Sequence, residues 1–204
     1  MMRIGEEMAG VLEALPGHAA FDGWNVTALG RALADAGEAP EDAALLFPGG
    51  AGEMIEAFFA WSFVRMETAA AQADLAAYRT PARVRAVAAI WFEQNAGNKE
   101  AVRRALSWLS LPGNLLRGLR INAGMADAVW HAAGDKSADF NWYTKRGLLA
   151  AVLAATILYW VHDRSADEEA VLWFLDRRLA DVAWAGGLRK RVAGRLRGRR
   201  FGVG

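Results

Sequence analysis

The chain has 204 residues, of which 54% are hydrophobic, and it contains nine tryptophans and nine phenylalanines. This composition is too apolar for a disordered chain, and the length suits a single domain or at most two subdomains. The chain has no cysteine, which excludes a disulfide framework, thiolate zinc sites, iron–sulfur ligation and a cysteine nucleophile. The formal net charge of +1, by itself, argues against a basic nucleic-acid binder and against an acidic tail.

This near-neutral total combines segments of opposite charge. Residues 1–60 hold ten acidic and two basic side chains, whereas residues 185–204 hold seven basic side chains and no acidic one. Such asymmetry indicates that the two ends of the chain meet different partners. The alternative is that both ends are ordinary solvated surface.

Apolar residues recur at helical spacing along nearly the whole chain. A first helix is predicted from Ile4 to Leu15, with Pro16-Gly17 expected to end it. Further helices are predicted near residues 27–37, after Pro40, and over about 52–78, 81–95, 99–110, 114–133, 140–162 and 167–185. The uncharged stretch 147–161 is shorter than the roughly 17–25 residues of a spanning helix and is predicted to be a buried one. With no alternating strand pattern, the predicted fold class is all-α.

The first predicted helices have a recognisable spacing. A helix after Trp24 is followed by Gly37 and, ten residues later, by Phe47, and residues 24–56 resemble the N-terminal DNA-binding domain of TetR-type regulators. In that family the stretch between the glycine and the phenylalanine presents basic and hydroxyl side chains to DNA. Here residues 38–46 hold three acids and no cation, so this degenerate helix-turn-helix is predicted not to bind nucleic acid. A ligand-sensing transcription regulator is nevertheless the alternative function.

Aromatic and polar side chains crowd around one predicted turn between residues 125 and 146. His131, Asp135 and Asp139 could be imagined as metal ligands or as an acid–base pair, but their spacing matches no metal motif. The two aspartates serve equally well as turn and cap residues. We therefore predict no metal, no cofactor and no enzymatic activity.

The same run carries the most specific pattern in the chain. It contains Trp130-His131, Ala133-Gly134-Asp135, Ser137 and Asp139-Phe140-Asn141-Trp142-Tyr143-Thr144, with Arg146 following, Leu111-Pro112 and Asn114 upstream and Trp173-Phe174-Leu175 and Arg178 downstream. From about Trp24 to Ala185 the chain resembles the coenzyme Q biosynthesis protein nine family, as a bacterial member would.

The resemblance implies a TetR-like, usually homodimeric protein that binds isoprenoid lipids and supports the di-iron hydroxylase of demethoxyubiquinone. It implies a cytoplasmic location, peripheral on the inner membrane, or the matrix side of the mitochondrial inner membrane in a eukaryote. It also implies dimerisation through the helices near 140–162 and 167–185. The implied partner-binding residues are Val129, where eukaryotic members have Met, and Asp139, Trp142, Tyr143 and Arg146.

We predict three segments: the degenerate helix-turn-helix (1–50), a lipid-binding and dimerisation domain (51–185) and a basic amphipathic tail (186–204). An isoprenoid needs an apolar tunnel, and its candidate walls are Phe58, Phe59, Phe63, Trp91, Trp108, Leu116, Leu149, Leu153 and Ile157, unless these are ordinary core. In the tail an apolar stripe is flanked by cations, which predicts binding to an anionic membrane, the alternative being a frayed cationic tail. The membrane-binding candidates are Trp184, Leu188, Arg189, Lys190, Arg191, Val192 and Leu196.

Overall fold

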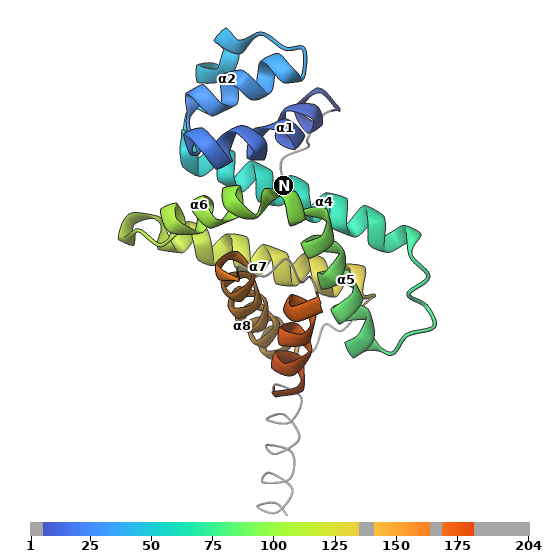
Figure 1. The fold of residues 1–204 in the computed structure, drawn as a ribbon. Helices are drawn as coiled ribbons and strands as arrows, with labels where there is room; N and C mark the ends of the chain where they lie inside the picture. Colours follow the sequence, from blue (N-terminus) through green and yellow to red (C-terminus); the bar gives the residue numbers. More distant parts are fainter. Residues whose placement is uncertain (1–5, 135–140, 164–168, 182–204) are drawn as a thin grey trace, which may run out of the picture.

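The structure, a computed structural model, describes residues 6–134, 141–163 and 169–181. These residues form helices joined by short turns and contain no strand, so the all-α prediction is confirmed (Figure 1). The helices are α1 (Glu6–Asp22), α2 (Val26–Asp35), α3 (Ala43–Leu46), α4 (Ala51–Gln72), α5 (Thr80–Gln94), α6 (Lys99–Leu109), α7 (Leu115–Ala132) and α8 (Asn141–His162). Residues 169–181 form a further helical segment.

Helices α1 to α3 form the head of the molecule, at the top of Figure 1. The side chain of Asn25 caps α2 by accepting a hydrogen bond from the Ala28 N–H at 3.0 Å. Gly37, with a φ of +80°, makes the turn that follows α2, a conformation that favours glycine. In the position of a recognition helix there is only a 3₁₀ turn (Pro40–Asp42) and the four-residue α3, with Glu41 and Asp42 exposed.

The prediction that Pro16-Gly17 ends the first helix was wrong, because α1 continues to Asp22. A proline inside a helix removes one backbone hydrogen bond and disfavours the turn around it. Here Leu12, Leu15 and Ala19 lie on one face of α1 and are fully buried, with α1 packed mainly against α2. Their burial offsets the local cost of the proline.

Helix α4 forms the centre of the core and contacts α1, α5 and α7. Its buried Ser62 accepts a hydrogen bond from the Trp91 indole N–H of α5 at 3.0 Å and donates one to the Phe59 carbonyl at 2.8 Å. The predicted extension of this helix to Tyr78 was wrong, since α4 ends at Gln72. The Arg83 side chain instead binds the loop that follows, donating hydrogen bonds to the carbonyls of Ala76 and Tyr78.

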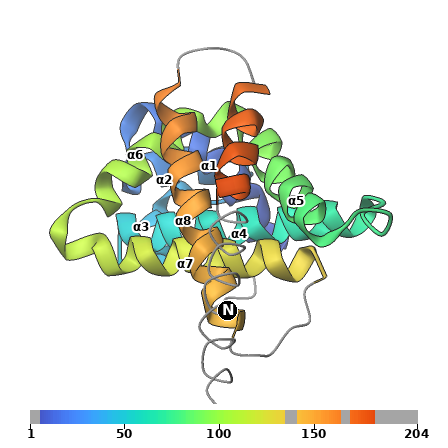
Figure 2. The same ribbon diagram turned by 90° about the horizontal axis from the view of Figure 1, so that it is seen from below.

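Helix α7 lies between α4 on one side and α8 on the other (Figures 1 and 2). Only one face of α8 is buried, so the prediction that residues 147–161 form a buried helix holds for that face alone. Leu148, Ala151 and Leu158 are exposed because no neighbouring helix covers that side among the described residues. By length and composition Thr144–His162 would also pass as a membrane span, a test that core helices pass as well.

Candidate lipid-binding groove

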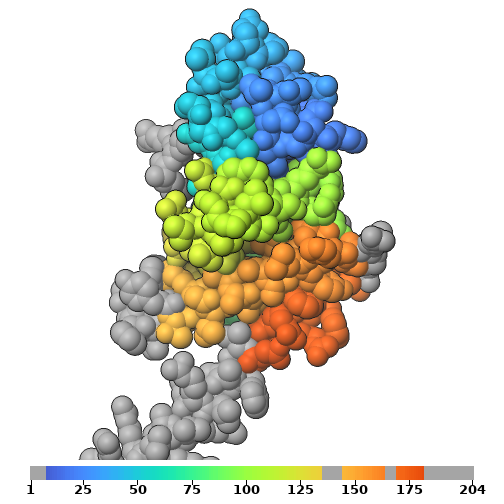
Figure 3. All heavy atoms as spheres, turned by 90° about the vertical axis from the view of Figure 1, so that its left-hand side faces the viewer, coloured from blue at the N-terminus to red at the C-terminus, as the bar shows by residue number. Residues whose placement is uncertain are grey.

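An apolar groove of about 360 Å³ opens between α4, α6, α7 and α8. Figure 3 shows the face concerned, with the α6–α7 connection in lime beside the orange α8. Its lining residues are Phe59, Phe63, Leu106, Leu109, Ser110, Leu115, Gly118, Leu119, Ile121, Asn122, Met125, Ala154, Ile157 and Leu158. Ser110 and Asn122 are the only polar members of this lining, and Asn122 donates its amide hydrogen to the Ala150 carbonyl at 3.0 Å. The groove therefore suits a hydrocarbon ligand with few polar groups.

Small residues create the width of this groove. A Cβ added at Gly118 would lie 3.4 Å from the Cβ of Leu109, in van der Waals contact, so α7 packs closely on α6 at this glycine. Gly124, one helical turn and a half further along α7, lies close to Phe63, which a Cβ there would approach to 3.7 Å. On the opposite wall Ala154 leaves space where a larger side chain of α8 would fill it.

An ion pair and a polar contact join α4 and α7 beside the groove. Arg117 of α7 donates to Glu56 of α4 at 3.0 Å, and His131 Nδ1 lies 3.1 Å from a Glu67 carboxylate oxygen. A second hollow of about 810 Å³ runs between the same two helices and shares Phe59, Phe63 and Ile121 with the apolar groove. Its other lining is more polar, including Arg120 and Asp127. Along α7 the lining residues thus change from the apolar ones of the groove to the charged ones of the second hollow.

Three of the nine predicted lipid walls, Phe59, Phe63 and Ile157, line the apolar groove. Phe58, Trp91, Leu149 and Leu153 are buried but lie outside its lining, Trp108 is half-buried, and Leu116 is exposed. Phe58 instead packs its ring against Trp24, with centroids 5.3 Å apart. Apolarity alone could not separate these core residues from groove residues, because both kinds are buried side chains on the same helices.

The nine candidates left out seven large apolar residues of the lining: Leu106, Leu109, Leu115, Leu119, Ile121, Met125 and Leu158. A signal was nevertheless present, since Leu115 and Leu119 stand one turn apart around Gly118 in a segment that has no acidic residue. Several leucines on an exposed helix face are typical of a surface that binds a partner protein, a membrane or an apolar ligand.

The predicted partner residues are placed unequally. Val129 is fully buried in α7, so its side chain has no surface to offer a partner in this structure. Arg146, near the start of α8, is largely buried and forms an ion pair with Asp127 of α7. Trp142 and Tyr143 belong to the first turn of α8, but their side chains lie outside the described residues, as do Asp139 and the candidates Trp184, Leu188, Arg189, Lys190, Arg191, Val192 and Leu196.

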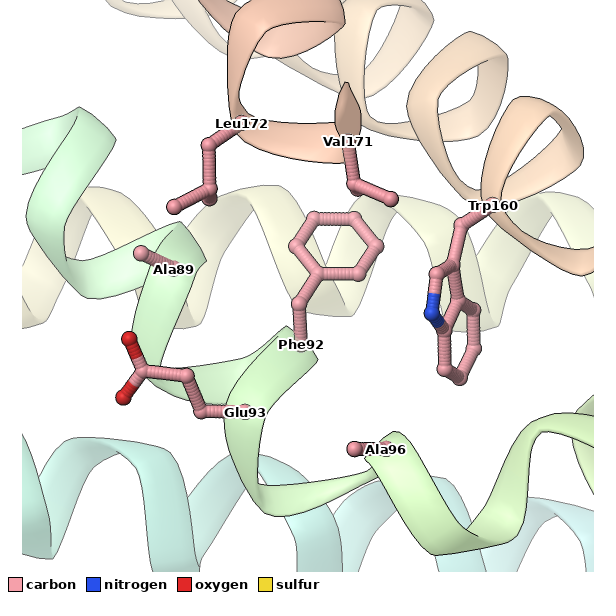
Figure 4. Close-up of a pocket in the computed structure, with 7 residues that line it drawn as sticks. All are labelled: Ala89, Phe92, Glu93, Ala96, Trp160, Val171 and Leu172. Carbon is pink, nitrogen blue, oxygen red and sulfur yellow. The ribbon is translucent and has the colours of Figure 1, made fainter. Parts of the chain in front are cut away.

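A small pocket of about 40 Å³ lies where the helical segment 169–181 packs on α5 and α8 (Figure 4). Phe92 and Trp160 meet edge to face there, with centroids 5.6 Å apart, and Val171 and Leu172 close it from the other side. Ligand sites of small organic molecules usually measure about 300–1,000 Å³. This pocket is therefore a packing seam between helices and is too small for such a ligand.

The helical head, the central α4 and the groove enclosed by the following helices form a TetR-like helical fold. A TetR transcriptional regulator from Nitrosomonas europaea ATCC 19718 superposes with a TM-score of 0.67, covering 87% of this chain and 98% of that one. The sequence identity is 19%, so this likeness establishes the fold alone.

Residues 116–186 match the family model named COQ9. The human protein "Ubiquinone biosynthesis protein COQ9, mitochondrial" is 45% identical over 89 residues, which are 44% of this chain and 28% of that protein. The Schizosaccharomyces pombe protein of the corresponding name is 33% identical over 111 residues, 53% of this chain and 44% of that one. The aligned segment of the chain thus spans under a third of the human protein.

The resemblance to this family is confirmed by these matches. The matched segment begins at residue 116, whereas the sequence resemblance was expected from about Trp24. It contains α7 and α8, and hence two of the four helices that line the groove. The remaining two, α4 and α6, lie outside the matched residues.

Proposed function

We propose that this chain is a non-enzymatic, lipid-binding accessory protein of ubiquinone biosynthesis. The apolar groove between α4, α6, α7 and α8 is the observation that carries the proposal. Its COQ9 domain supports the pathway, since proteins named for ubiquinone biosynthesis share that segment. The ligand would be an isoprenoid precursor of the quinone.

The physics of the groove favours such a ligand. Burying hydrocarbon in an apolar site contributes roughly 25 cal/mol for each Å² removed from water. Phe59, Phe63 and Ile157 supply rigid apolar walls for an isoprenoid chain. The amide of Asn122 is the polar group best placed to meet an oxygen of a quinone ring or its precursor.

Helix α7 connects the groove to the proposed partner surface. Leu119 lines the groove, and Trp130 stands eleven residues later, which corresponds to about 16 Å along the helix. The Arg146–Asp127 ion pair joins this end of α7 to the start of α8. We propose that the demethoxyubiquinone hydroxylase docks at this end, through Trp142 and Tyr143 among others, and receives the lipid from the groove.

The acidic head supports this proposal over a transcription regulator. Residues 38–46 contain no Lys or Arg, and Glu41 and Asp42 are exposed where a recognition helix would approach phosphates. Binding to DNA gains its affinity from neutralising those phosphates. Binding to upstream DNA in a gel-shift assay, with an affinity that falls as salt rises, would favour the regulator instead.

The groove is tested by filling it. In Ala154→Phe the added ring occupies the groove, whereas in Ala82→Phe the same ring is added at an exposed alanine of α5 that lies outside the groove lining. Lipid extracts of the purified proteins are compared by mass spectrometry. We expect an isoprenoid lipid in the parent and in Ala82→Phe, and about tenfold less of it in Ala154→Phe. Equal amounts in all three proteins, or none in the parent, would refute a lipid site in this groove.

The partner surface is tested separately. Tyr143→Glu is expected to abolish capture of the purified hydroxylase by the immobilised chain. Tyr78→Glu, which changes an exposed tyrosine after α4, is the control and should leave capture unchanged. Capture by both variants alike would exclude this surface.

We propose that the basic tail holds the protein on an anionic membrane; its residues lie outside the described ones. We also propose that two copies of the chain form a dimer. Seven cations without an acid in residues 185–204 support the first proposal. Removing residues 186–204 should weaken sedimentation with anionic vesicles, most strongly at low salt. Light scattering of the full chain tests the dimer.

A further inference from the structure

Five exposed leucines lie in the lining of the apolar groove or close to it in the chain, and we call them the leucine rim: Leu111, Leu115, Leu116, Leu119 and Leu158. Each is between 50% and 68% exposed. Four of them come from the α6–α7 connection and the first turns of α7, and Leu158 comes from α8. Single exposed leucines are common, but five exposed leucines of which three line one groove indicate an interaction surface.

The rim continues into the groove without a polar boundary. Leu115, Leu119 and Leu158 both line the groove and remain half exposed or more. Whatever covers the rim therefore also covers the opening through which a ligand must enter. The α6–α7 connection projects from the side of the molecule in two perpendicular views, so a flat surface can reach it (Figures 1 and 2).

The charges beside the leucine rim indicate what kind of surface binds there. Residues 106–126 contain Arg117 and Arg120 and no acidic residue. Arg117 is already paired with Glu56 of α4, so Arg120 is the cation that this argument uses. Arg120 is exposed one turn after Leu116, so its guanidinium can meet phosphates while the leucines enter hydrocarbon. Exposed leucines beside cations are typical of surfaces that lie on an anionic bilayer.

We propose that the leucine rim is a second membrane-contacting surface, separate from the basic tail, which rests on an anionic bilayer and admits the isoprenoid lipid directly into the groove. The proposal rests on the proposed function for the identity of the ligand. The contact with the bilayer itself depends only on the rim.

The contact with the bilayer is tested with a fluorophore. Because the chain has no cysteine, a single introduced cysteine can be labelled at one chosen position. A polarity-sensitive dye is attached to Leu116→Cys in the full chain, and to Leu45→Cys, an exposed leucine of the head, as the matched control. Vesicles of phosphatidylcholine with phosphatidylglycerol should brighten and blue-shift the dye at residue 116, and spin-labelled acyl chains should quench it. The dye at residue 45 should not respond.

Two results would overturn the proposal. One is an unchanged dye at residue 116 when sedimentation shows that the protein is bound to the vesicles. The other is a change that follows protein concentration without vesicles, since this would assign the rim to a second copy of the chain.

A charge on the rim separates this proposal from the proposed function. Leu111→Asp changes a rim leucine that does not line the groove, and Leu45→Asp is its control. We expect Leu111→Asp to lower vesicle affinity and the transfer of a fluorescent isoprenoid from vesicles about tenfold, with binding of a water-soluble, short-chain quinone unchanged. Unchanged vesicle affinity would refute the rim, whereas failure of the parent to bind the short-chain quinone would refute only the lipid site.

Discussion

Among the described residues, Glu100 at the start of α6 has a strongly perturbed ionisation. Hydrogen bonding from Arg103, the largest cause, and from Arg104 together lowers the pKa of this carboxyl to about 2. The carboxylate oxygens lie 2.6 Å from Arg103 and 3.0 Å from Arg104, one turn along the same helix. The position in the first turn also suits a negative charge near a helix N-terminus.

The depressed pKa of Glu100 gives a prediction with a defined sign. A carboxyl whose folded pKa lies below its unfolded one stabilises the fold above the unfolded value and loses this effect as pH falls through the folded one. Glu100→Gln should therefore lower Tm by about 1–2 °C at neutral pH, a small effect because the pair is exposed. The difference from the parent should disappear between about pH 4.5 and 2.

Thermal unfolding followed by circular dichroism across that range measures this difference. Raising the salt concentration at neutral pH should also reduce it, because exposed ion pairs are screened. A difference that stayed constant from neutral to acidic pH would show that Glu100 acts through packing or helix propensity instead.

At the scale of helices, one glycine of α4 leaves room for side chains of α6 and α7. A Cβ at Gly52 would lie 2.6 Å from Arg117 Nη1 and 2.8 Å from the Trp108 ring. Both distances are shorter than any packed contact allows, so either the two side chains or the two helices must move. The missing side chain thus lets Arg117 cross α4 and reach Glu56 beside the groove.

Two glycine replacements separate the effect of this contact on stability from the effect of intrinsic helix propensity. Gly52→Ala should destabilise the protein by about 1–2 kcal/mol through overpacking. Gly17→Ala lies in α1 with nothing within 4 Å of the new Cβ, and should stabilise it by about 0.5–1 kcal/mol. Urea unfolding measures both effects. Equal changes in the two variants would mean that propensity alone acts at residue 52.

At the scale of the molecule, the head and the body share one core. The Trp24 indole N–H donates to the Ala101 carbonyl of α6 at 3.0 Å, and its ring packs against Phe58 of α4. Buried residues form a continuous cluster that includes Leu12 and Leu29 of the head and Met125 of α7. The predicted boundary near residue 50 therefore separates sequence segments that are packed together.

This shared core predicts one unfolding transition for the residues around it. Trp24→Ala removes a buried ring and should destabilise head and body together by about 3–5 kcal/mol. Phe21→Ala, at a ring that is 84% exposed, is the control and should change stability by less than about 0.5 kcal/mol. Far-ultraviolet circular dichroism and tryptophan fluorescence should give the same midpoint. Two separate transitions in the parent would contradict a shared core.

The predictability of the site differs from that of the fold. Helical periodicity located α2, α5, α6, α7 and α8 to within a few residues, because their apolar faces and flanking Gly and Pro residues are local signals. It missed the continuation of α1 beyond Pro16, since that depends on burial against α2. Phe58 and Phe59 are adjacent and equally apolar, yet only Phe59 lines the groove.

By itself, the sequence determined the all-α class, the uneven charge of the two ends and the resemblance carried by residues 125–146, since composition, periodicity and short motifs are local properties. Only the tertiary structure decided which apolar side chains form a core and which enclose a groove. Whether a residue faces another helix or an opening depends on the approach of helices distant in the chain, as at Gly52 and Gly118. The same packing left the leucine rim exposed, because no described helix covers these leucine side chains.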